Sequence, residues 1–88
     1  MKIQVLFSKD FKKKMKKLDR KISSLFDRKL ELFMNDPTVK ILNTHNLKGK
    51  YIGHKSFNVT GDFRVVYQML DDATAYFVDI DSHSNLYE

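Results

Sequence analysis

The sequence predicts an α+β fold in which an N-terminal strand and a two-helix hairpin precede a three-stranded antiparallel meander. Three observations predict it. Apolar residues alternate in the first seven positions, recur at helical spacing between residues 11 and 33, and alternate again between residues 52 and 80. Because consecutive helices bury their apolar stripes against a common partner, we expect both to pack on one face of the sheet. The length of 88 residues suits one domain, residues 1–88.

The first strand is expected over Met1–Phe7, where every second residue is apolar. Ser8 is a suitable N-cap for the helix that follows, and Asp10 in its first turn favours the helix dipole. The apolar stripe of this helix is spaced four, three and four residues apart: Phe11, Met15, Leu18 and Ile22. Lysines fill most of the remaining helix surface.

The second helix is expected to begin after a cap at Asp19 and to end at Asn35–Pro37, because proline disfavours helix in the residue before it. Its apolar positions are Ile22, Leu25, Phe26, Leu30 and Phe33. Val39–Lys50 is expected to connect this helix to the meander. The two helices, with facing stripes, are therefore predicted to form a helical hairpin that covers one side of the sheet.

The meander is expected to consist of strands Ile52–Val59, Phe63–Leu70 and Thr74–Ile80. Each strand alternates between an apolar and a more polar face, so a register shift of one residue would turn a whole apolar set out to water. On the last strand the apolar face is expected to comprise Tyr76, Val78 and Ile80.

Loop lengths predict the register of the meander. Joining the first two apolar faces needs an odd loop, and Thr60–Asp62 supplies three residues, which places Asn58 opposite Arg64. The next hairpin needs an even loop, centred on Asp72–Ala73, which places Arg64 opposite Asp81. The polar side of the sheet is then expected to hold His54, Ser56, Asn58, Arg64 and Asp81, with His83 one step further along.

The charge of the chain is unevenly distributed. All 16 lysines and arginines lie at or before Arg64 together with six of the eleven acids, so this part carries ten more positive than negative charges. The last 24 residues hold the other five acids and no base. Such a basic region predicts a polyanionic partner, although a lysine-rich helix surface that only favours solubility gives the same pattern.

Several classes of protein are excluded by composition. The chain has no cysteine, hence no disulfide framework and no thiolate metal site. Its three histidines lack the spacing of metal ligands, so we expect no metal and no other cofactor. It shows no signal-peptide pattern and no apolar stretch near the ~20 residues that a membrane span requires. A soluble cytoplasmic protein without membrane partners is expected.

Three segments carry a resemblance to a known family: Leu47-Lys48-Gly49, the run Gly61–Tyr67, and the tail Asp81–Tyr87. They resemble the RelE/YafQ toxins of the RelE/ParE superfamily, which have a His-x-Leu-Lys-Gly segment, an Asp-aromatic-Arg-x-x-Tyr strand and a terminal Gly-Thr-His-x-x-aromatic tail. The resemblance spans the whole chain. It implies a RelE-like fold and the toxin of a type II toxin–antitoxin system, an endoribonuclease (mRNA interferase) that cuts messenger RNA on the ribosome without a metal and inhibits translation.

The resemblance also implies roles for individual residues. His83 is the first candidate for acid or base, since histidine titrates near neutrality. Arg64 would hold the phosphate, because guanidinium matches phosphate geometry bidentately. Tyr87 occupies the terminal aromatic position, Asp62 matches an acid of YafQ-like members, and His45 matches the histidine before Leu-Lys-Gly. Attack of a ribose 2′-hydroxyl on the adjacent phosphate would use such groups as base, acid and charge stabiliser.

Each of these residues also has a structural interpretation. His83 would cap the end of a strand, Arg64 would form a cross-strand salt bridge to Asp81, and Tyr87 would be a hydrophobic plug. A turn aspartate beside glycine, such as Asp62, is common without any function.

Four further residues are predicted to contact RNA: Lys48, Lys50, Lys55 and Asn58. YafQ-like toxins carry a histidine at the position of Asn58, whereas Arg64 resembles the RelE and YoeB branches. Asp81 replaces the usual small residue before the tail and either orients the Arg64 guanidinium or neutralises part of its charge. The lysines of the first helix are expected either to contact ribosomal RNA or to serve solubility alone.

The expected partners are messenger RNA on the ribosome, ribosomal RNA and a cognate acidic antitoxin that folds upon binding. Two alternatives remain at this point: a ParE-like noncatalytic inhibitor of DNA gyrase, and an inactive relative that binds RNA or antitoxin only. The histidine-bearing tail and Arg64 favour the nuclease.

Overall fold

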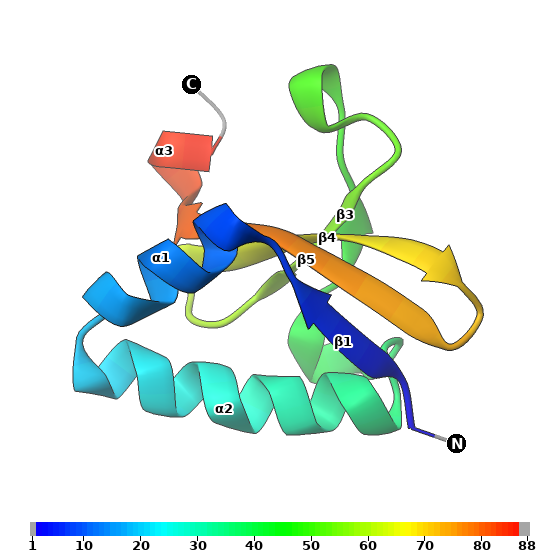
Figure 1. Ribbon diagram of the computed structural model, residues 1–88, viewed down its shortest axis with the longest axis horizontal. Helices are drawn as coiled ribbons and strands as arrows, with labels where there is room; N and C mark the ends of the chain where they lie inside the picture. Colours follow the sequence, from blue (N-terminus) through cyan, green and yellow to red (C-terminus); the bar gives the residue numbers. More distant parts are fainter. Residues whose placement is uncertain (1, 87–88) are drawn as a thin grey trace.

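A five-stranded sheet with strand order β1-β5-β4-β3-β2 forms the centre of the computed structural model, which describes residues 2–86 (Figure 1). The elements are β1 (Gln4–Phe7), α1 (Lys9–Lys17), α2 (Arg20–Asn35), η1 (Lys40–Leu42), β2 (His45–Asn46), η2 (Gly49–Tyr51), β3 (Lys55–Asn58), β4 (Phe63–Asp71), β5 (Thr74–Ser82) and α3 (His83–Leu86), where η denotes a 3₁₀ turn. β1 pairs parallel with β5, and the other strands pair antiparallel. The predicted α+β fold is confirmed.

Both predicted helix caps are present. The Ser8 hydroxyl accepts a hydrogen bond from the backbone N–H of Phe11 at 3.0 Å, and Asp19 Oδ1 accepts one from Ile22 at 2.9 Å. Each bond satisfies one N–H that the first helical turn leaves without a partner. The second helix ends at Asn35, ahead of Pro37, as predicted.

Helix α1 lies beside β5 at the sheet edge, just beyond the point where β1 ends. β1 pairs with β5 only as far as Phe7 opposite Phe77. At the next residue, the Ser8 backbone N–H donates to the Phe77 carbonyl at 3.0 Å and the Ser8 hydroxyl donates to the Val78 carbonyl at 2.9 Å. Because these bonds fix the start of the helix against β5, α1 runs beside the C-terminal half of that strand.

The main core lies between α2 and the sheet and is built around aromatic rings. Phe77 on β5 is fully buried, and its ring lies 5.3 to 6.3 Å, centroid to centroid, from a set of other rings: Phe7, Phe11, Phe26, Phe33, Phe57 and Tyr67. Most of these pairs are edge-to-face or tilted, the arrangements that the ring quadrupole favours. The helical stripes and the strand alternation thus converge on one residue of the central sheet.

The predicted register is confirmed where it matters for the site. Asn58 lies opposite Arg64, and Arg64 lies opposite Asp81. The prediction for Tyr76 and Val78 was wrong, because β5 has one extra residue, Val78, between the positions that oppose Val66 and Tyr67. This β-bulge moves Phe77, and not its neighbours, into the main core.

The connector and the first strand of the meander also differ from prediction. β3 covers only Lys55–Asn58, because the preceding segment forms the η2 turn and then a bend at Gly53, whose φ of 87° lies in the left-handed region that favours glycine. Ile52, expected in the strand, is 76% exposed. The single turn α3, which follows β5, was not predicted.

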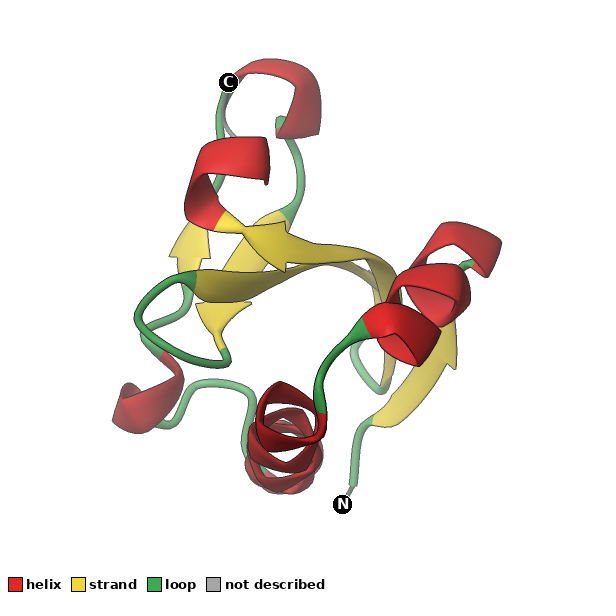
Figure 2. Cartoon of the chain, turned by 90° about the vertical axis from the view of Figure 1, so that its left-hand side faces the viewer, coloured by secondary structure: helices red, strands yellow, loops and turns green. Residues whose placement is uncertain are grey.

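The sheet has a second, smaller apolar cluster on the face opposite α2. Its buried members are Leu47, Val66 and Leu86, with Tyr51 and Val78 packed against them. Both η2 and α3 stand on this side of the sheet, whereas α2 lies on the other side (Figures 1 and 2). The cluster therefore joins the tail of the chain to the connector.

Candidate functional site

The candidate site lies on the side of the sheet that bears η2 and α3. The sheet pairings place on this side the residues Ser56, Asn58, Arg64, Val66, Asp79 and Asp81, which define the α3 face. Apart from Val66 at its centre, every member is polar, and acids, an amide and a guanidinium lie on three adjacent strands. The alternation of side chains along each strand separates this polar set from the aromatic core below.

Three buried polar atoms in this region have no hydrogen-bond partner among the residues described. They are His54 Nδ1, Asn58 Oδ1 and Arg64 Nε. Such an atom costs about 1–3 kcal/mol when it is left unpaired, so proteins tolerate few of them. Asn58 and Arg64 are direct partners across β3 and β4. An unpaired cationic donor, which suits an anionic oxygen, therefore lies beside an unpaired acceptor, which suits a hydroxyl or amino group of a ligand.

The carboxylate of Asp81 forms its ion pair with a lysine of helix α1 and not with the arginine opposite it. Lys14 Nζ on α1 lies 3.0 Å from Asp81 Oδ2 and 2.7 Å from Asp79 Oδ1. Burial alone lowers the pKa of Lys14, but the hydrogen bonds and charges of the two aspartates outweigh it and raise that pKa. The predicted salt bridge between Arg64 and Asp81 is not among the ion pairs of residues 2–86.

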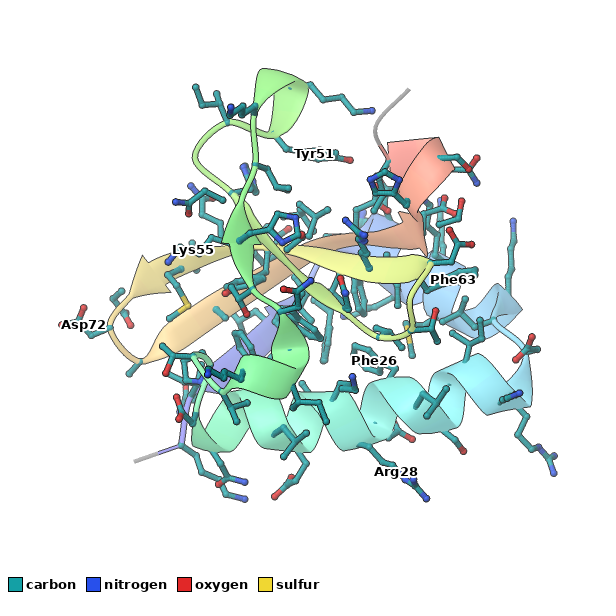
Figure 3. All side chains as sticks on the ribbon, turned by 180° about the vertical axis from the view of Figure 1, so that it is seen from behind. Phe26, Arg28, Tyr51, Lys55, Phe63 and Asp72 are labelled. Carbon is teal, nitrogen blue, oxygen red and sulfur yellow. The ribbon has the colours of Figure 1, made fainter. Side chains whose placement is uncertain are left out.

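Further hydrogen bonds connect both aspartates to the segments above the sheet. Tyr51 of η2 donates its hydroxyl proton to Asp79 Oδ2 at 2.9 Å, and Asn85 of α3 donates to Asp81 Oδ1 at 3.0 Å. Figure 3 shows Tyr51 reaching from η2 toward the side on which α3 lies. Burial tends to raise the pKa of Asp81, but the bonds from Asn85 and Lys14 lower it overall. The two aspartates thus hold α1, η2 and α3 together.

Asp62 and His83 are brought together by the backbone. Phe63 lies opposite Ser82, and one step beyond this pair the N–H of His83 donates to the carbonyl of Asp62 at 2.8 Å. Both side chains are exposed. They lie at the end of the sheet, two residues along each strand from the pair formed by Arg64 and Asp81. Three predicted site residues, Asp62, Arg64 and His83, therefore lie along adjacent strands. Tyr87 lies outside the described residues.

His45 has a defined tautomer. Its Nδ1 lies 3.0 Å from the carbonyl oxygen of Asn43, which only accepts, so Nδ1 carries the proton. In the neutral ring, its Nε2, 3.3 Å from the Ser56 hydroxyl, is then the acceptor nitrogen. Ser56 is fully buried, whereas His45 is exposed. The buried serine and the loop carbonyl therefore orient an imidazole whose acceptor nitrogen suits a base.

His45 and His83 lie apart on this side of the sheet. Pairing runs from His45 on β2 through β3 and β4 to Asp79 on β5. Neighbouring strands lie about 4.8 Å apart, so His45 and Asp79 are separated by three spacings, or about 14 Å. His83 lies a further four residues along the chain from Asp79. The sequence predicted both histidines as site residues, and the fold places Arg64 on a strand between them.

The three predicted RNA-binding lysines do not form one group. Lys48 and Lys50 are exposed at η2, where Lys50 Nζ lies 5.2 Å from the centre of the Tyr51 ring, a cation–π contact. Lys55 is the partner of Tyr67 and so belongs to the opposite side of the sheet from Ser56. Lys55 and Ser56 are consecutive residues of β3, so their side chains point to opposite faces of the sheet.

Sequence reasoning missed three residues of this site. Lys14 gave no signal, because 67 positions separate it from Asp81 and its helix carries several similar lysines. Tyr51 was included in no motif. His54 was expected on the polar side, but no role was assigned to it; its ring packs edge-on against Tyr51, with 5.9 Å between the ring centres.

Among the residues described, no three His, Asp or Glu side chains are grouped so that they would hold a metal ion. Over the same part of the chain, no helix has the length and apolar character of a membrane span.

Solved structures with this fold define its class. YafQ from E. coli superposes with a TM-score of 0.79 at 19% identity, covering 98% of this chain and 99% of YafQ. The E. coli DinJ–YafQ toxin–antitoxin complex gives a TM-score of 0.78 at 18% identity over 100% of both chains. The RelBE2 toxin–antitoxin complex of Mycobacterium tuberculosis gives 0.76 at 19% identity, covering 94% and 100%. The fold is that of the small RelE- and YafQ-type toxins.

The family follows from the sequence itself. The family model described as the bacterial toxin of type II toxin–antitoxin system, YafQ, matches residues 1–88. The chain therefore belongs to the YafQ family and is a toxin of the type II toxin–antitoxin class. The resemblance deduced from the three sequence segments is confirmed. No curated protein matched the chain in a direct search.

Proposed function

We propose that this toxin, acting in the cytoplasm as a single domain of residues 1–88, cleaves messenger RNA on the ribosome and so stops translation. The observation that carries the proposal is the state of Arg64, whose Nε is buried and has no partner among the described residues, while the neighbouring Asp81 pairs with Lys14. A guanidinium in this state has free donors for a phosphate oxygen, and a charge-assisted bond of this kind is among the stronger ones in proteins.

The proposed reaction needs no cofactor. The ribose 2′-oxygen attacks the adjacent phosphorus, a 2′,3′-cyclic phosphate forms, and the bond to the 5′-oxygen of the next nucleotide breaks. One group removes the 2′ proton, and another supplies a proton to the departing 5′-oxygen. Arg64 stabilises the negative charge that develops on the phosphate oxygens, a contribution of about 10²–10³-fold for one well-placed donor.

His83 is the proposed proton-transfer group at this phosphate. Its backbone bond to Asp62 fixes the start of α3 at the end of the sheet that bears Arg64. Asp62, exposed beside it, is proposed to orient the imidazole or share its proton, and Tyr87 to stack on a base. Proton transfer of this kind contributes about 10²–10⁴-fold. Neutral histidine accepts a proton and its cation donates one, so the same group suits either half of the reaction.

The remaining predicted residues are proposed to hold the rest of the RNA. His45, Lys48 and Lys50 lie on or beside the η2 side of the site, where they would contact the nucleotides next to the scissile phosphate. Asn58, whose Oδ1 is unpaired, would accept a hydrogen bond from a base or from a ribose hydroxyl. Lys55, on the other side of the sheet, would contact ribosomal RNA rather than the cleaved strand.

We also propose an acidic antitoxin as the cognate partner. The excess of ten positive charges in residues 1–64 favours a negatively charged segment that folds as it binds. The E. coli YafQ structure in complex with DinJ supports this proposal by likeness. The open reading frame next to the toxin gene is expected to encode a short acidic protein whose co-expression restores growth, and failure to do so would remove this part of the proposal.

The nature of the cut ends tests the proposed reaction. Cells are induced to express the toxin, and breaks in a reporter message are mapped by primer extension. We expect breaks inside codons, downstream fragments that begin with a 5′-hydroxyl, and no breaks when the start codon of the reporter is removed. Fragments with a 5′-phosphate would contradict the chemistry. Intact messages together with arrested DNA supercoiling would instead indicate a gyrase inhibitor.

A further inference from the structure

Arg64 and Asp81 are directly opposite each other on antiparallel strands, yet they do not pair. Opposite charges at such positions normally attract each other, because their Cβ atoms lie only about 5 Å apart. Here the partner of Asp81 is Lys14, from a helix 67 positions earlier in the chain. Arg64 keeps a buried Nε with no partner among the described residues.

The carboxylate of Asp81 has both oxygens occupied. Oδ2 accepts from Lys14 at 3.0 Å, while Oδ1 accepts from Asn85 at 3.0 Å and from the backbone N–H of Ser82 at 2.8 Å. Lys14 is held in turn by Asp79 at 2.7 Å. The side chain of Asp81 is 24% exposed, so these contacts are partly shielded from water and keep more of their strength.

From this geometry we propose that Lys14 is a positioning residue of the toxin: by binding Asp81 it keeps the Arg64 guanidinium available for an RNA phosphate. The proposal rests on the proposed function, in which Arg64 contacts that phosphate. Lys14 itself does not touch the RNA. It acts by removing the internal carboxylate that would otherwise compete with the phosphate for the same donors.

Loss of Lys14 has a specific expected consequence. The freed carboxylate of Asp81 would turn to the guanidinium across the strands, where an Arg–Asp pair forms two parallel hydrogen bonds. The phosphate must then displace an internal anion before it binds. The expected loss of RNA affinity is about tenfold, the size of one charge-assisted hydrogen bond. Removing the charge of Asp81 in the same protein restores the affinity, because no competitor remains.

The first experiment measures affinity for a short single-stranded RNA made uncleavable by 2′-O-methyl groups. We compare wild type, Lys14→Met, the double variant Lys14→Met with Asp81→Asn, and Lys13→Met, which removes the same charge from the exposed side of α1. Lys14→Met is expected to bind about tenfold more weakly, the double variant and Lys13→Met within about twofold of wild type. Lys14→Arg is expected to retain binding. Equal losses in Lys14→Met and Lys13→Met, or no recovery in the double variant, would overturn the proposal.

A second measurement detects the new pair directly, without RNA. The chain has only three arginines, Arg20, Arg28 and Arg64, so the Nε–Hε signals are few enough to assign by nitrogen-15 NMR. In Lys14→Met the Arg64 signal is expected to shift and its proton to exchange more slowly with water, and the double variant is expected to reverse both changes. An unchanged Arg64 signal in Lys14→Met overturns the proposal. If instead the signal shifts but Arg64→Ala binds RNA as well as wild type does, the phosphate contact of the proposed function fails, and the role assigned to Lys14 fails with it.

Discussion

The ammonium of Lys14 lies 3.0 Å from a carboxylate oxygen of Asp81, so the acid opposite the site arginine forms its ion pair with a helix rather than across the sheet. The sequence had left two readings for Asp81, as a group that orients the arginine or as one that lowers its charge. The ion pair supports neither. It leaves Arg64 without a direct partner among the described residues, on the face where the proposed RNA contact lies.

The stability contributed by this ion pair should depend on pH at both ends of the scale. The folded state lowers the pKa of Asp81 from 3.8, since bonds from Asn85 and Lys14 outweigh the effect of burial. Its contribution is therefore present above pH 3.8 and lost as the pH falls below that value. The pKa of Lys14 is raised from 10.5, although burial opposes this, so its contribution persists up to pH 10.5 and is lost above it.

Thermal unfolding across pH checks this dependence. The difference in Tm between wild type and Asp81→Asn should be constant near neutrality and should shrink as the pH falls below 3.8. Asp72→Asn, which changes an exposed acid in the β4–β5 turn, is a control for general charge effects. If the difference in Tm between wild type and Asp81→Asn stays unchanged down to pH 2, Asp81 does not contribute to stability through its charge.

Arg64→Ala is expected to lower messenger cleavage by about 10²–10³-fold, because the developing phosphate charge loses its cationic donor. Cleavage on translating ribosomes measures the effect, and circular dichroism checks the fold. Arg64→Lys is the matched variant: it keeps the charge but loses the bidentate geometry, so an intermediate rate is expected. Full activity of Arg64→Ala would show that the phosphate is held elsewhere.

His83→Gln is expected to reduce the rate of cleavage by about 10²–10⁴-fold while affinity for uncleavable RNA stays near that of wild type. Glutamine keeps a similar size and a hydrogen-bonding group but transfers no proton at neutral pH. The matched variant is His54→Gln, which changes a histidine of the same region that has no proposed part in catalysis. If both substitutions slow cleavage equally, the effect reflects disturbance of the site and not proton transfer.

Phe77→Ala should be among the most damaging core substitutions. The side chain is fully buried and its ring contacts aromatic partners from β1, both long helices and two strands. Truncation of a buried phenylalanine costs about 3–5 kcal/mol, through lost transfer energy and the cavity left behind. Urea unfolding measures the loss. Ile52→Ala, at a residue 76% exposed, should change the free energy of unfolding by less than about 0.5 kcal/mol.

Much of the fold could be predicted because local rules agreed with each other. Caps at Ser8 and Asp19, the helix end before Pro37 and two hairpin loops of definite length each have a local cause. The loop lengths and the alternation predicted both cross-strand neighbours of Arg64, and the pairing with Asp81 holds because two register shifts in β4–β5 offset each other. The same rules missed the bulge at Val78, since an extra residue in a strand leaves no distinct mark in an alternating sequence.

The candidate site was only partly accessible from the sequence. Arg64 and His83 stood in recognisable motifs, and the register brought their strands together. The partner of Asp81 could not be predicted, because the choice between Lys14 and Arg64 depends on where α1 lies along β5, and that position follows from tertiary contacts of Ser8. Long-range ion pairs of this kind carry no periodic signature.

The two apolar clusters lie on opposite sides of the same sheet and share no buried residue. One encloses the aromatic core, whereas the other, with three buried members among residues 2–86, holds the segment around η2 and the α3 turn against the sheet. Detachment of η2 and α3 from the sheet would therefore expose little apolar surface and leave the aromatic core intact. This local opening should cost a small fraction of the free energy of global unfolding. Amide hydrogens of η2 and α3 are therefore expected to exchange with solvent before those of the strands around the aromatic core.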